Sequence, residues 1–157
     1  MKVDQDVEQA ARKLYAAAVA QNHDWFTDAM AAAGQRGEDF VAAVIRHGVL
    51  VDTAALHHLH RGKPSEAQIS DLLTEFVNTY ETWLQGTAAE SARPFLTALA
   101  DHKPVIDVVQ RGDLPDVVFA VGAWLLAAFL PEGKDWTDFL DEILDALETA
   151  PTQGSPQ

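Results

Sequence analysis

The sequence contains no cysteine, which excludes disulfide bonds and cysteine-ligated zinc sites. It is also poor in basic residues: 11 lysines and arginines stand against 24 aspartates and glutamates, and the formal net charge is −13. Proteins that bind nucleic acid through its phosphate backbone need a surplus of positive charge. We therefore expect no direct binding to nucleic acid.

The sequence also lacks an uninterrupted apolar run long enough to span a bilayer. Its longest uncharged apolar run, residues 117–130, has 14 residues, whereas a transmembrane helix needs about 20. The first eight residues carry three acidic side chains and no apolar stretch, so they do not resemble a secretory signal. We accordingly expect a cytoplasmic protein that does not bind a membrane.

Apolar residues recur at helical spacing along almost the whole chain. With 157 residues, 48% of them hydrophobic, the chain suits one domain. We predict an all-α fold: a single domain over residues 1–150 with seven to nine helices, followed by a disordered tail at 151–157. The segment 117–130 has no polar face to present to water, so we expect it to form a central apolar helix surrounded by the others.

Capping residues indicate where two of these helices begin. Ser65 and Gln68 have the spacing of a capping box, and the apolar residues that follow predict a helix that ends at Gly86. Asp135 is a favourable N-cap for a last helix over residues 136–149.

A glycine and an aspartate suggest a break in the first half of the chain. Gly48 follows an apolar-periodic segment, and glycine commonly ends helices, so we expect a helix over 38–47 to end there. Asp52 and Thr53 are both good N-capping residues, so we expect one of them to begin a separate short helix through residue 60.

The charge of the C-terminal third is the strongest functional feature. From residue 113 onward, nine acidic residues stand against a single base, Lys134. In the predicted last helix Asp138, Asp141, Asp145 and Glu148 recur at steps of three or four, opposite the apolar face. A solvated helix face is the competing interpretation, but such a face normally mixes both signs of charge. The residues that we predict to bind a partner are Asp135, Asp138, Asp141, Glu142, Asp145 and Glu148.

These charges favour a non-enzymatic protein that binds a basic protein partner through its last helix, as an inhibitor, an immunity-type antagonist or an adaptor. Glycine-rich nucleotide-binding motifs and the Gly-x-Ser-x-Gly motif of hydrolases are missing. We therefore favour an interaction protein over an enzyme and expect no cofactor. The half-apolar composition is also compatible with a homodimer, because not every apolar face can be assigned to one core.

Two alternatives stay open. One is a small-molecule sensor with an apolar pocket near Trp124, lined by Phe119, Trp124 and Phe129. The other is a metal-binding protein or enzyme that uses His57 and His60, which are three residues apart and therefore adjacent on a helix. Further metal ligands would have to come from elsewhere in the chain. The competing interpretation is that these histidines lie at the solvated C-terminal end of a helix.

Overall fold

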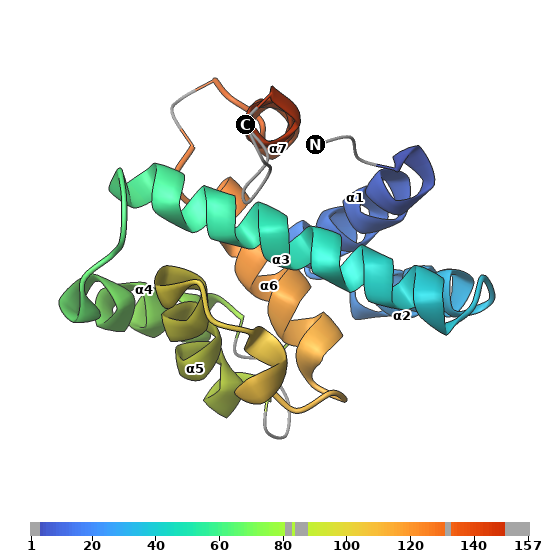
Figure 1. The fold of residues 1–157 in the computed structure, drawn as a ribbon, viewed down its shortest axis with the longest axis horizontal. Coiled ribbons are helices and arrows are strands. Elements are labelled where there is room, and N and C mark those ends of the chain that lie inside the picture. The colour runs from blue at the N-terminus through green and yellow to red at the C-terminus, as the bar shows by residue number, and fades with distance from the viewer. Residues whose placement is uncertain (1–3, 81–82, 84–87, 131–132, 150–157) are drawn as a thin grey trace, which may run out of the picture.

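The computed structural model describes residues 4–80, 83, 88–130 and 133–149. These residues form seven α-helices and one 3₁₀ helix and contain no strand, which confirms the all-α prediction. The predicted tail at 151–157 and Gly86 lie outside them, but the helix predicted to reach Gly86 already ends at Thr79, with Tyr80 as its C-cap. The helices in Figure 1 are α1 (Gln5–Val19), α2 (His23–Gly34), α3 (Glu38–His60), α4 (Glu66–Thr79), α5 (Ala88–Asp101), α6 (Leu114–Ala127) and α7 (Trp136–Thr149), with the 3₁₀ helix at Val105–Asp107.

Helices α3 and α6 form the centre of the fold. The helix α3 packs against α1, α2, α5, α6 and α7, and α6 packs against α1, α3, α5 and α7. In Figure 1 these two helices cross, and the others surround the crossing. Every residue of α6 from Val117 to Leu126 is buried. It is therefore the central apolar helix that its sequence predicts, although it ends at Ala127 rather than near residue 130.

The helix α3 continues through the point at which the sequence suggests a break. Gly48 is buried inside it, and a Cβ at this position would lie 2.7 Å from Val118 Cγ1 of α6. Glycine is thus needed for the close approach of two helices and not to end one. The predicted helices over 38–47 and 52–60 are one helix, and Asp52 lies in its interior rather than at an N-cap.

By length and composition alone, α3 is also apolar enough to cross a membrane, with a mean hydropathy of 1.3. Among the described residues it is the one helix with this property. It packs against five other helices.

The predicted helix starts at α4 and α7 are confirmed. The Ser65 hydroxyl accepts a hydrogen bond from the Gln68 backbone N–H at 3.1 Å, and the Gln68 side chain accepts one from the Ser65 backbone N–H at 2.8 Å. At α7, the Asp135 carboxylate accepts hydrogen bonds from the Trp136 backbone N–H at 2.9 Å and from the Thr137 hydroxyl at 2.7 Å. These caps fix the N-termini of α4 and α7.

Candidate functional site

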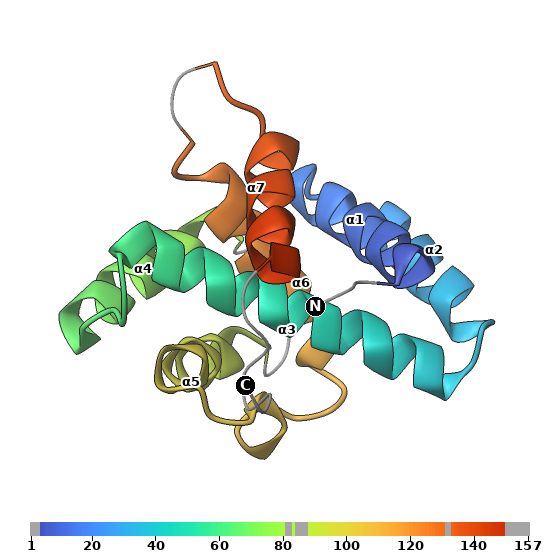
Figure 2. The same cartoon turned by 45° about the horizontal axis from the view of Figure 1, so that its top comes forward.

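The helix α7 lies on the outside of the molecule (Figure 2). Five of the six predicted partner-binding residues lie on it, and Asp135 directly precedes it. Its inner face is apolar and packs against α3 and α6. At 100° per residue, the acidic side chains lie within an arc of about 140° around the helix. All six are exposed: Asp135, Asp138, Asp141, Glu142, Asp145 and Glu148. We call this surface the α7 acidic face.

Two cations pair with carboxylates of the α7 acidic face. Arg12 of α1 pairs with Asp141, and Lys134 pairs with Glu142. The side chains of Asp141 and Glu142 nevertheless remain 60% and 50% exposed. Exposed pairs of this kind contribute about 0–1 kcal/mol to stability. The cations of a partner can therefore compete for these carboxylates.

Asp135 and Asp138 also stabilise the first turn of α7. The Asp138 carboxylate accepts a hydrogen bond from the Asp135 backbone N–H at 3.3 Å. Negative charge is favourable here, because the N-terminus of a helix carries a partial positive charge. An ionised carboxylate has about four acceptor positions, so both side chains retain acceptors that face solvent.

The aromatic residues of the alternative apolar pocket lie on two sides of α6. The Trp124 ring contacts the Phe129 ring at a centroid distance of 5.0 Å and the Phe76 ring at 5.8 Å. Phe119 packs instead against Tyr15 of α1, at 4.9 Å. Phe119 and Trp124 are five residues apart and therefore point about 140° away from each other. The structure thus brings Trp124 and Phe129 together and places Phe119 elsewhere.

The rings of His57 and His60 are both held by carbonyl groups of α3. Nδ1 of His57 lies 2.8 Å from the carbonyl oxygen of Thr53, and Nδ1 of His60 lies 2.9 Å from that of Leu56. The His57 ring also stacks on His102, at a centroid distance of 4.6 Å. In the part of the chain that the structure describes, no three histidine or acidic side chains are close enough to hold a metal ion.

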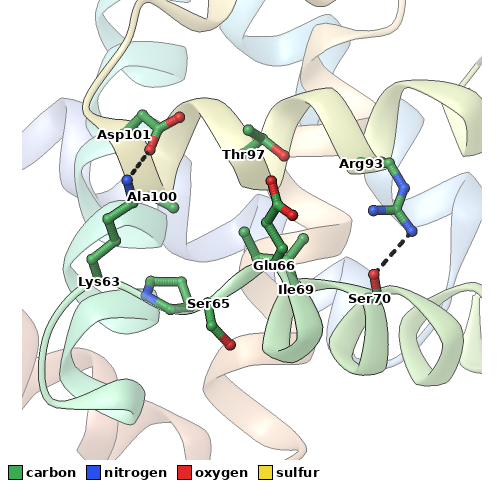
Figure 3. A pocket seen from close by; sticks show the side chains of 10 residues that line it. Lys63, Ser65, Glu66, Ile69, Ser70, Arg93, Thr97, Ala100 and Asp101 are labelled. Carbon is green, nitrogen blue, oxygen red and sulfur yellow. Dashed lines mark hydrogen bonds and ion pairs between the residues drawn. The ribbon is translucent and has the colours of Figure 1, made fainter.

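A polar cleft between α4 and α5 was not predicted from the sequence (Figure 3). Its volume is about 640 Å³. The only trace of it in the sequence is the four-residue spacing of Glu66 and Ser70, and of Arg93 and Thr97, which places each pair on one side of its helix. The cleft is lined by Lys63, Pro64, Ser65, Glu66, Ile69, Ser70, Arg93, Thr97, Ala100 and Asp101.

The formal charges of the four ionisable side chains in this cleft cancel. At one end, Lys63 Nζ lies 2.6 Å from Asp101 Oδ1, and this hydrogen bond holds the pKa of the Asp101 carboxyl below its ordinary value. At the other end, Arg93 Nη2 donates a hydrogen bond to Ser70 Oγ at 3.3 Å. Neither Arg93 nor Glu66 forms an ion pair with any described residue.

A third polar cluster lies inside the core, where α1, α3 and α6 meet. The Tyr15 hydroxyl lies 2.8 Å from Asp52 Oδ1 and 3.1 Å from the carbonyl oxygen of Gly48. Both side chains are fully buried, and Asp52 Oδ2 has no hydrogen-bond partner among the described residues. Burial raises the pKa of both groups well above their ordinary values. We call Tyr15 and Asp52 the buried pair.

No protein family, curated protein or solved structure matches this chain.

Proposed function

We propose that the protein is a non-enzymatic, cytoplasmic binding protein that engages a basic protein partner through the α7 acidic face. Inhibitors, immunity-type antagonists and adaptors act in this way. The main support is that six exposed carboxylates share one side of α7, and that the two of them that pair with Arg12 and Lys134 remain half exposed or more. Carboxylates this dense repel one another, and the lysines and arginines of a partner would relieve that repulsion.

The α7 acidic face is held rigidly, which favours binding. Phe139, Leu140 and Ile143 of the inner face are at most 7% exposed. The His58 ring of α3 also packs against the Phe139 ring, at a centroid distance of 5.4 Å. Binding would therefore not be opposed by an entropy cost of ordering the helix. The electrostatic field of the face reaches about 8 Å at physiological ionic strength and would accelerate association.

The proposal predicts that charge reversal on α7 abolishes binding, whereas the same reversal elsewhere does not. The test variant is D138K/D141K/D145K. The matched control is D24K/D28K/D71K, whose three aspartates are exposed on α2 and α4. Both variants change the net charge equally. In affinity purification from native cells with mass spectrometry, recovery of a basic partner should fall at least about tenfold with the α7 variant and less than about twofold with the control.

Two further measurements make this test specific. Raising the salt concentration from about 0.05 to 0.5 M should release the partner, since salt screens exposed charges. Asp138 also stabilises the start of α7. The comparison is therefore repeated with D141K/D145K as the test variant and D24K/D28K as the control, and circular dichroism checks that both variants are folded. If the α7 and control variants lose the same proteins, or neither loses any, the proposal is wrong.

A further inference from the structure

We infer that the cleft between α4 and α5 binds a small zwitterion such as a free amino acid, with the ligand carboxylate at Arg93 and its ammonium group at Glu66. The cleft is formed by helices other than α7, so this inference is independent of the proposed partner-binding face.

Arg93 provides the carboxylate-binding end. Its guanidinium donates to the neutral Ser70 hydroxyl and pairs with no carboxylate in the described part of the chain, although the protein has 24 acidic residues. A guanidinium has five N–H donors in a planar fork that matches a carboxylate. The hydroxyls of Ser70 and Thr97 line the same cleft (Figure 3) and can donate to the second carboxylate oxygen.

Glu66 provides the ammonium-binding end. Figure 3 shows its carboxylate pointing across the cleft toward Thr97 of α5. The other cation of the cleft, Lys63, is bonded to Asp101 at 2.6 Å. Glu66 is therefore the carboxylate of the cleft that is left for a positively charged group of a ligand.

The spacing of the two ends fits a short zwitterion. Glu66 and Ser70 are four residues apart on α4, which corresponds to about 6 Å along the helix axis, and Ser70 contacts Arg93. Charge-assisted hydrogen bonds are about 2.7–2.9 Å long. The two ends are therefore about one helical turn apart along α4, so a ligand that bonds to both needs its ammonium and carboxylate groups close together in its covalent structure.

The volume and net charge of the cleft also favour such a ligand. A volume of about 640 Å³ falls within the range of about 300–1,000 Å³ typical of small-molecule sites. The protein carries a formal charge of −13 and repels free anions at long range, whereas a zwitterion has no net charge. Ile69 and Ala100 belong to the apolar part of the cleft lining.

The test is a titration of ¹⁵N-labelled protein with glycine, L-alanine, L-leucine and L-glutamine, each to about 20 mM, because small polar ligands commonly bind with millimolar Kd. At least one of them should shift the backbone amide resonances of Ser70 and Thr97 in a saturable way. Analogues of that amino acid that lack one charge, such as 4-methylpentanoate and L-leucinamide for leucine, should bind at least about tenfold more weakly, because each leaves one end unpaired.

Substitutions then assign the two ends. R93Q and E66Q should each raise Kd about tenfold. The controls R46Q and E75Q remove exposed charges from α3 and α4 outside the cleft and should leave Kd unchanged. The inference is overturned if none of the four amino acids gives a saturable shift, if the analogue without an amino group binds as tightly as the amino acid, or if R93Q and E66Q bind like the wild type. None of these results affects the proposal for α7.

Discussion

Replacement of Gly122 by alanine is expected to lower the free energy of unfolding by about 3 kcal/mol. A Cβ at this position would lie 2.1 Å from Asp52 Oδ1 and 2.4 Å from Tyr15 Cε1. Both distances are far below van der Waals contact, and both side chains are fully buried and bonded to each other. Either α6 must move away from α1 and α3, or the hydrogen bond of the buried pair must break.

The intrinsic preference of helices for alanine opposes this effect but is smaller. Alanine is favoured over glycine in a helix interior by about 0.5–1 kcal/mol. Overpacking of a core costs about 1–3 kcal/mol, and leaving a buried polar group without its partner costs about 1–3 kcal/mol more. The net result is therefore a loss of stability.

Urea unfolding followed by circular dichroism measures this change. The matched control is G34A at the end of α2, where a Cβ would meet nothing within 4 Å; its stability should stay within about 0.5 kcal/mol of the wild type. A G122A protein as stable as the wild type would contradict the tight crossing of α1, α3 and α6.

This crossing also shows why part of the fold could not be predicted from the sequence. The starts of α4 and α7 depend on local hydrogen bonds, such as those between Ser65 and Gln68, and they were predicted correctly. Gly48 and Asp52 have the residue types of a helix end and an N-cap. Their actual surroundings are Val118 and Gly122 of α6, about 70 residues later in the chain. The prediction of two helices where α3 is one follows from this difference.

The two candidate surfaces also differ in how far the sequence alone could predict them. The α7 acidic face lies on a single helix, so the spacing of its residues was enough to place them on one side. The cleft requires Ser70 of α4 to meet Arg93 of α5, and only the packing of the two helices determines that contact. The spacing of His57 and His60 likewise showed that they are adjacent, but not that carbonyl groups of α3 hold their Nδ1 atoms.

The buried pair is expected to make stability depend on pH. Burial raises the pKa of Asp52 well above its ordinary value of 3.8, so the folded carboxyl stays protonated at pH values where the unfolded chain is ionised. A group with a raised pKa in the folded state contributes its full stability below the unfolded pKa. This contribution is lost as the pH rises toward the folded pKa.

Among the described residues, the groups around Asp52 offer no positive charge to offset this loss. Tyr15 of α1 donates its hydrogen bond to Asp52, which lowers the pKa of the carboxyl, but burial outweighs this effect. The pKa of Tyr15 is itself raised by burial and by Asp52. His47 lies one turn away on α3, and burial together with Arg12 lowers its pKa, which favours the neutral ring. Gly122 of α6, where a Cβ would lie 2.1 Å from Asp52 Oδ1, has no side chain.

The D52N variant should remove this pH dependence, because asparagine has nearly the same shape and does not ionise. Relative to the wild type, its free energy of unfolding should rise by about 1.4 kcal/mol for each pH unit above pH 4, as long as folded Asp52 remains protonated. The difference should therefore grow steadily with pH until folded Asp52 ionises.

Urea unfolding of wild type, D52N and D71N at intervals from pH 4 to pH 8 tests this expectation. Subtracting the wild-type curve cancels the contributions of the other acidic residues, which all three proteins share. Asp71 is exposed on α4, so the D71N difference should stay nearly flat. If the wild-type and D52N curves run parallel over this range, Asp52 is not held as a buried, protonated carboxyl. In that case Asp52 would have water or a cation nearby that could replace its hydrogen bond to Tyr15. The loss of stability in G122A would then come from overpacking alone.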